Sequence, residues 1–169
     1  FYPVQCEGEE SSRNVFYTGA APNQQAIPAV DYFLEELGVQ TFALLGTDYV
    51  YPRTTNRILE QYLRDHGIPE DSIFVNYTPF GHSDWSSIVA DVVALGESGQ
   101  QVGVISTING DANVGFYNEL AAAGVSADDI PVVAFSVGEE ELSGLDTSHL
   151  VGHLAAWNYF QSADTPENE

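Results

Sequence analysis

Thr41-Phe42-Ala43-Leu44-Leu45 is the stretch of this 169-residue chain that decides its fold class. Four of these five residues are apolar, which indicates a strand buried on both faces, as strands in parallel sheets are. A helix is expected next, with Pro52 in its first turn, His66 near its end and Gly67 as its stop. A buried strand followed directly by a helix is the unit from which parallel sheets are built.

The same alternation of strand and helix continues on both sides of this stretch. Further strands are expected at residues 14–18, 72–77, 102–107 and 132–136, with a sixth extended segment at 150–152. Helices are expected from Asn23 to Leu37, from Ser83, Ser86 or Ser87 to Leu95, from Val114 to Ala123 and, as a short acidic helix, from Glu139 to Leu145. This order predicts an α/β fold, a three-layer α/β/α Rossmann-like lobe with a mostly parallel sheet.

The composition indicates one folded, acidic domain. Four arginines and no lysine stand against 25 acidic residues, which gives a formal net charge of −21. Nucleic acid and anionic lipid are therefore not expected as partners, because both are bound through cations. The acids are scattered and 12% of the residues are aromatic, which is typical of a solvated acidic surface and not of a disordered tail.

Enzyme and metal chemistry find no support in the motifs. The sequence has no Gly-x-Ser-x-Gly elbow, Walker loop or Gly-x-Gly-x-x-Gly turn. The four histidines, at 66, 82, 149 and 153, form no His-Glu-x-x-His motif. The lone cysteine, Cys6, stands beside acids that raise a thiol pKa. We therefore expect no catalytic residues, no metal and no cofactor.

Neither a membrane span nor an export signal is visible in the chain. No stretch approaches the roughly 20 apolar residues that a spanning helix needs. The chain opens on Phe1-Tyr2-Pro3-Val4, which is strand-like, and has no initiating methionine. We expect an excised piece of a longer protein, whose export signal would lie upstream.

Ligand chemistry is expected in the loops that follow the strands, where open parallel sheets bind their ligands. The loop after the first buried strand carries Tyr49 and Tyr51, two residues apart. Each tyrosine can offer a ring face and a hydroxyl to a small polar ligand. Alternatively, one of them packs on the neighbouring helix while the other is exposed.

Two more of these loops combine polar groups with an expected helix start. Asn109, Gly110 and Asp111 follow one strand, at a point where free backbone N–H groups of a helix are expected. Ordinary turn and capping chemistry is the alternative for this loop. Ser136 and Val137 precede three acids at residues 139–141, for which capping of a helix start is the favoured explanation.

Several segments resemble the urea-binding subunit of bacterial urea ABC transporters, in the type I periplasmic solute-binding protein family. They are residues 1–10, 17–25, 45–53, 109–113, 152–160 and 164–168. The resemblance covers nearly the whole chain. The same family includes amide-sensing regulators of amidase operons, which are similar in the Gly-x-Asp-Tyr-x-Tyr-Pro segment at residues 46–52.

The resemblance implies a two-lobed receptor of which this chain is mainly the second lobe. Residues 1–13 would be a crossover near the hinge, residues 14–152 the ligand-binding lobe, and residues 153–169 the return crossover. A first lobe would be missing from this chain. The implied ligand contacts are Tyr2, Val4, Tyr49, Tyr51, Asn109, Gly110, Ser136 and Val137.

The implied function is that of the substrate-binding component of an ABC importer. It would bind urea or a short aliphatic amide, which are small, neutral and polar solutes, and deliver it to a membrane permease. Its location would be periplasmic or extracytoplasmic. The alternative function is a cytoplasmic regulator that senses amides and controls an amidase operon.

Overall fold

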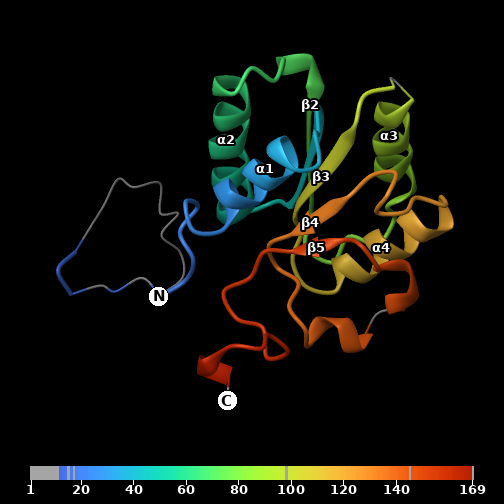
Figure 1. The fold of residues 1–169 in the computed structure, drawn as a ribbon. Coiled ribbons are helices and arrows are strands. Elements are labelled where there is room, and N and C mark those ends of the chain that lie inside the picture. Colours follow the sequence, from blue (N-terminus) through green and yellow to red (C-terminus); the bar gives the residue numbers. More distant parts are fainter. Residues whose placement is uncertain (1–11, 15, 17, 98, 145, 169) are drawn as a thin grey trace.

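A five-stranded parallel sheet forms the centre of the protein, in a computed structural model that describes residues 12–14, 16, 18–97, 99–144 and 146–168 (Figure 1). The strand order is β2-β1-β3-β4-β5, and every neighbouring pair is parallel. The strands are β1 (Thr41–Thr47), β2 (Ile73–Thr78), β3 (Val102–Thr107), β4 (Val132–Ala134) and β5 (Leu154–Ala155). The predicted α/β class is confirmed.

Two pairs of helices cover the two faces of the sheet, as the prediction of three layers required (Figure 1). Helices α1 and α2 lie on one face, and α3 and α4 lie on the other. Their bounds are α1 (Ala26–Glu35), α2 (Val50–Asp65), α3 (Ser86–Gly96) and α4 (Ala112–Ala122). Short 3-10 turns are η1 (Glu70–Ser72), η2 (Glu141–Gly144), η3 (Thr147–His149) and η4 (Pro166–Asn168).

Strand β1 supplies the core on both faces, because successive side chains of a strand point in opposite directions. All seven of its residues are buried. Phe42 and Leu44 belong to the cluster formed with α1 and α2. Ala43 and Leu45 belong to the cluster formed with α3 and α4. The nearly continuous apolar run of this strand therefore follows from its central place between two layers of helices.

Two of the predicted strands are wrong. In the segment 14–18, Asn14 lies in a turn and Phe16 is 79% exposed, while residues 15 and 17 lie outside the described part. An exposed Phe16 leaves the segment without the burial that would hold it in this sheet. The extended segment at 150–152 is a turn instead, because Gly152 has a φ of +92° that no strand accommodates. Strand β5 begins two residues later.

The expected helix starts also need correction. Helix α1 begins at Ala26 and not after Asn23, and Gln25 precedes it without capping it through its side chain. Helix α3 is preceded by Trp85 and has no side-chain cap from a serine; the carboxylate of Asp84 accepts the Ser86 N–H at 3.3 Å in the turn before it. Helix α4 begins two residues earlier than expected. In the predicted acidic helix 139–145, the described residues 139–144 form only the short turn η2, and residue 145 lies outside the described part.

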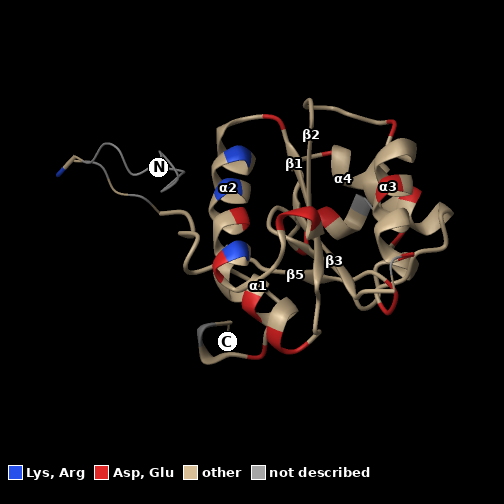
Figure 2. Ribbon diagram, turned by 90° about the horizontal axis from the view of Figure 1, so that it is seen from above, with Lys and Arg blue, Asp and Glu red and all other residues tan. Residues whose placement is uncertain are grey.

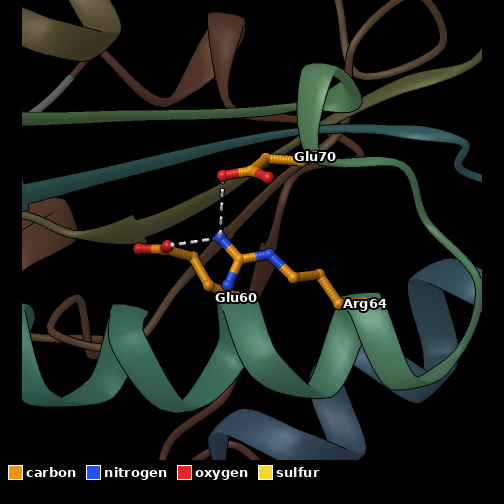
Figure 3. A network of polar contacts seen from close by, with 3 residues as sticks. All are labelled: Glu60, Arg64 and Glu70. Atoms are coloured by element: carbon orange, nitrogen blue, oxygen red, sulfur yellow. Dashed lines mark hydrogen bonds and ion pairs between the residues drawn. The ribbon is translucent and has the colours of Figure 1, made fainter.

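Positive charge is concentrated on α2, which carries three of the four arginines (Figure 2). One of them, Arg64, lies between two carboxylates (Figure 3). Its Nη2 is 3.2 Å from Glu60 Oε2 and 3.7 Å from Glu70 Oε1. The contacts connect the end of α2 to η1, but such exposed pairs contribute only about 0–1 kcal/mol each.

The core leaves no room for a side chain at Gly103 in β3. A Cβ at this position would lie 2.6 Å from Cδ1 of Phe33, which is fully buried. We expect Gly103→Ala to lower the free energy of unfolding by about 1–3 kcal/mol through overpacking. Gly96→Ala is the matched control, because its Cβ would have an ordinary contact of 3.6 Å with Ile130. Unfolding in guanidinium chloride measures the free energy of unfolding of both variants. Equal free energies for the two would contradict the packing argument.

Protonation of His153 is expected to weaken the fold. Its Nδ1 accepts the Val132 N–H at 3.1 Å, and burial lowers its pKa below the ordinary value of 6.5. As the pH falls below 6.5 the unfolded chain takes up a proton that the folded chain does not, so stability decreases toward the folded pKa. We expect His153→Asn to reduce the loss of unfolding free energy between pH 7.5 and 5.5. If His153→Asn loses as much unfolding free energy between these two pH values as the parent protein, His153 is not the source of the loss.

Candidate functional site

The strand order reverses direction between β1 and β3, which is where open α/β sheets bind ligands at the carboxyl ends of their strands. The chain runs from β1 outward to β2 on one side, and from β3 through β4 to β5 on the other. The loops that follow β1 and β3 therefore diverge around this point. They contain Asp48 and Tyr49 on one side and Asn109 and Gly110 on the other.

Buried polar side chains gather beneath this edge. All but Thr41 of the buried polar residues in the described part of the chain lie at the carboxyl ends of strands or in the adjoining turns of α2 and α4. We call this set the buried polar layer; it comprises Thr47, Thr55, Asn56, Thr78, Ser106, Thr107 and Asn113. This layer was not predicted from the sequence, because only one of the three threonines that close β1, β2 and β3, Thr107, also closes an expected strand of this sheet.

Hydrogen bonds of this layer hold the β1 and β3 loops together. The Asn109 N–H donates to Thr47 Oγ1 at 2.9 Å, and the Asn109 side-chain amide donates to Thr107 O at 2.9 Å. Thr107 Oγ1 in turn donates to Leu45 O at 3.1 Å. The loop that carries Asn109 is therefore fixed to β1 by a part-buried bond, and the strand end before it is fixed to β1 by a buried one.

Gly46 allows α2 to begin directly against the sheet. A Cβ on this residue would lie 2.5 Å from Thr107 Oγ1 and 2.7 Å from Pro52 Cβ, which no side chain can occupy. Only glycine therefore permits this approach of the first turn of α2 to β3. That approach sets the positions of both predicted tyrosines, which stand on either side of the helix start.

The two tyrosines have different environments. Tyr51 lies in the first turn of α2 and is 1% exposed, whereas Tyr49 is half-buried. Their ring centroids are 6.1 Å apart, and the ring of Phe80 lies 4.9 Å from that of Tyr49. Of the two alternatives, one tyrosine thus packs inside while the other remains accessible. Phe80, which follows β2 and is 64% exposed, was missed because nothing in the sequence connects that loop to Tyr49.

The positive charge nearest this edge is neutralised. Arg53, in the first turns of α2, places its Nε 2.5 Å from Asp48 Oδ1. This bond lowers the pKa of Asp48 and raises the pKa of Arg53, so both groups remain ionised and paired. The guanidinium also lies 4.5 Å from the centre of the Tyr77 ring. The edge therefore presents aromatic and amide groups beside a neutral ion pair.

The remaining predicted contacts lie partly at this edge and partly outside the described residues. Ser136 and Val137 follow β4; Val137 is 5% exposed and packs into the core, while Ser136 is half-buried. The hydroxyl oxygen of Ser136 is buried and has no hydrogen-bond partner within the described part of the chain. Tyr2 and Val4 lie outside that part. The accessible predicted contacts are thus Tyr49, Asn109 and Gly110, while the hydroxyl of Ser136 lies just beneath the surface.

The acids after β4 do not cap an α-helix, contrary to expectation. Glu141 accepts the Gly138 N–H at 2.9 Å, which closes a local turn. Glu139 accepts the N–H groups of Gln161 at 2.5 Å and Ser162 at 2.9 Å. A side-chain hydrogen bond from Ser162, together with these two backbone bonds, lowers the pKa of Glu139, so the carboxylate is charged at neutral pH. Glu139, which was expected to cap a helix start nearby, therefore binds the backbone of residues close to the C-terminal end of the chain instead.

Neither a metal centre nor a membrane-spanning helix is found in the described residues. Their histidine, cysteine and acidic side chains form no group of three that could hold a metal ion. None of their helices combines the length and apolar character needed to cross a bilayer.

A hollow of about 460 Å³ lies further along the same edge, next to β5. It is bounded by the segment that leads into α1, by the start of that helix and by Trp157, which follows β5. Its lining residues are Thr18, Gly19, Ala20, Gln24, Gln25, Pro28, Ala29, Ala156, Trp157 and Asn158.

Comparison with known families decides the relationship of the chain. A sequence profile described as "Periplasmic binding protein domain" matches residues 1–169. The chain belongs to this family of periplasmic binding protein domains. The expectation that it is not an enzyme is confirmed, because the family is one of binding proteins.

Solved structures of solute-binding proteins share the fold. An amino acid ABC transporter substrate-binding protein from Pseudomonas fluorescens Pf-5 gives a TM-score of 0.67 at 18% identity, over 86% of this chain and 37% of that protein. A solute binding protein of an ABC transporter from Rhodopseudomonas palustris HaA2, in complex with p-hydroxybenzoic acid, gives 0.70 at 18% identity, over 90% and 40%. A branched chain amino acid ABC transporter protein from Thermus thermophilus with bound valine gives 0.63 at 12% identity, over 82% and 35%.

The periplasmic binding protein domain described here spans little more than a third of these structures. At such low identities the likeness concerns the fold and not the solute. The resemblance stated from the sequence is therefore confirmed at the level of the family. The preference for urea or amides, and the contacts that would bind them, stay predictions.

The bond between Thr47 and Asn109 provides a test of how this site is built. Thr47→Val removes the acceptor of the Asn109 N–H but preserves the side-chain shape. We expect a loss of about 1 kcal/mol in the free energy of unfolding, with faster hydrogen exchange at the Asn109 amide. Thr47→Ser, which retains Oγ, serves as the control and should exchange like the parent protein. If the valine variant also exchanges like the parent, Thr47 does not hold the β3 loop.

Proposed function

We propose that the protein containing this chain is the solute-binding component of an ABC importer and that it binds urea or a short aliphatic amide. The observation that supports this most is the neutral character of the candidate site. Tyr49, Phe80 and Asn109 surround an edge where the guanidinium of Arg53 is already paired with Asp48. Aromatic walls with a few fixed polar groups suit a small, neutral and planar solute.

Urea and short amides match this edge in their hydrogen-bonding groups. Each offers N–H donors and a carbonyl acceptor without a net charge. The side chains of Asn109 and Ser136 can both donate and accept, and the faces of planar ligands pack well on aromatic rings such as that of Tyr49. The first turns of α2 and α4, neither of which has a side-chain cap, add N–H groups near the same edge.

Solutes that carry a carboxylate fit this edge less well. A carboxylate such as that of p-hydroxybenzoic acid or valine, the solutes in two of the similar structures, is best bound by a cation. Arg53 would have to leave Asp48 to serve that role, and a net charge of −21 opposes the approach of any anion. An uncharged solute without a carboxylate, such as urea or a short amide, carries neither of these costs.

The proposed function requires a second lobe and a membrane partner. In the proposed receptor a first lobe would close over the site, and the present chain matches only 37% and 35% of the length of two similar receptors. Residues 1–13 and 153–169 would then be the crossovers between the lobes. Closure over the solute would involve rotation about these segments. The loaded receptor would deliver its solute to an ABC permease in an extracytoplasmic compartment.

Calorimetry on the intact two-lobed protein tests the proposal. We expect binding of urea or acetamide, and no binding of leucine or 4-hydroxybenzoate. Binding of either acid without a response to urea or amides would overturn the solute class. This isolated chain should bind urea at least about a hundredfold more weakly, because half of the closed cleft is absent.

The contribution of Tyr49 is tested in the same protein. Tyr49→Ala should weaken urea or amide binding by about tenfold or more, since it removes the accessible aromatic wall. Tyr32→Ala is the matched control, because Tyr32 is also partly exposed but lies on α1, away from the carboxyl ends of the strands. An equal affinity of the two variants would exclude Tyr49 from the solute site.

A further inference from the structure

The carboxyl end of β4 is fastened to the segment by which the chain enters the lobe. Gln25, directly before α1, donates through Nε2 to Phe135 O at 3.2 Å and to Ala156 O at 2.6 Å. These acceptors are the residues that follow β4 and β5. One amide group therefore ties the entry segment to two neighbouring strand ends, across 110 and 131 residues of sequence.

The same end of β4 is fastened to the segment by which the chain leaves the lobe. The two carboxylate oxygens of Glu139 accept successive backbone N–H groups, from Gln161 at 2.5 Å and from Ser162 at 2.9 Å. Charge-assisted bonds of this kind are roughly twice as strong as neutral ones. They join the β4 loop (residues 136–140) to what we call the return segment (residues 156–163).

A second contact between the β4 loop and the return segment lies at Gly138. A Cβ on Gly138 would be 3.4 Å from Nε1 of Trp157, so the indole lies close against the loop backbone. Trp157 remains 38% exposed there. The loop that carries Ser136 is thus held on the return segment at two successive residues, Gly138 and Glu139.

We propose that Glu139 is a positioning residue that couples the β4 loop, which carries the predicted solute contacts Ser136 and Val137, to the movement of the return segment. The inference rests on the proposed function, in which the return segment is a crossover between two lobes. Closure then rotates the lobes about this segment. Because Glu139 binds the segment three residues from Ser136, opening either displaces the solute loop or breaks both carboxylate bonds. Solute binding and closure thereby favour each other.

The neighbouring acid provides a matched control. Glu140 is exposed and directly follows Glu139, but the bonds to the return segment come from Glu139 alone among the three acids of residues 139–141. Glu139→Gln and Glu140→Gln remove the same charge from adjacent positions. A difference between them therefore reports the bonds and not the net charge.

Hydrogen exchange on the present chain tests the link itself, independently of any solute. We expect Glu139→Gln to speed exchange at the Gln161 and Ser162 amides by about tenfold, since local opening no longer breaks charge-assisted bonds. Glu140→Gln should leave both amides unchanged. Glu139→Asp, one methylene shorter, should behave like the glutamine variant. Unchanged exchange in Glu139→Gln would overturn the link.

Solute affinity and lobe separation in the intact protein test the coupling. We expect Glu139→Gln to weaken urea binding by about tenfold, through faster dissociation, and to widen the distance between labels on the two lobes. Glu140→Gln should match the parent. Unchanged affinity and distance in Glu139→Gln, with urea bound by the parent, would overturn the coupling and leave the proposed function standing. If the parent binds another solute instead, only the solute class fails, and the comparison is made with that solute.

Discussion

The burial of β1 on both faces is the constraint on which the rest of the structure depends. Because Phe42 and Leu44 face one pair of helices while Ala43 and Leu45 face the other, the sheet needs cover on both sides. Two layers of helices then leave the ends of the strands as the accessible edges of the sheet centre. Gly46 brings α2 onto the carboxyl end without a gap. A binding site at this end is thus a consequence of how the core is covered.

The buried polar layer explains how loops can be precise at such an edge. A hydroxyl or amide in the interior costs stability unless it is hydrogen-bonded, so each bonded pair restricts the backbone on both sides of it. The hydrogen bonds of Asn109 with Thr47 and Thr107 restrict the loop of Asn109 in this way. The tyrosines obtain their positions differently, from the packing of the first turn of α2. Polar restraint on one side and close packing on the other give the candidate site two independent supports.

The parts of the fold that were predictable depend on local burial. Strand β3 was predicted with its observed bounds, and β1 extends two residues beyond the predicted five. Both strands could be recognised because a run of apolar residues indicates burial on both faces. Residues 14, 16 and 18 of the predicted strand 14–18 are not in the five-stranded sheet, and a short local pattern does not specify which sheet a strand joins. Gln25 and Glu139 could not be predicted, since their partners are distant backbone groups. Side-chain type alone suggested a local helix cap for Glu139 and no particular role for Gln25.

The concentration of arginine on α2 has a practical consequence. The chain has no lysine, so trypsin can cut only after its four arginines, and three of these lie within one helix. A protease needs an unwound stretch of backbone, which an intact helix does not offer. Apart from Arg13, every tryptic site is therefore protected by the same 16-residue element. The rate of tryptic cleavage after these three arginines would therefore report how often α2 unfolds locally. It would not report local unfolding elsewhere in the domain.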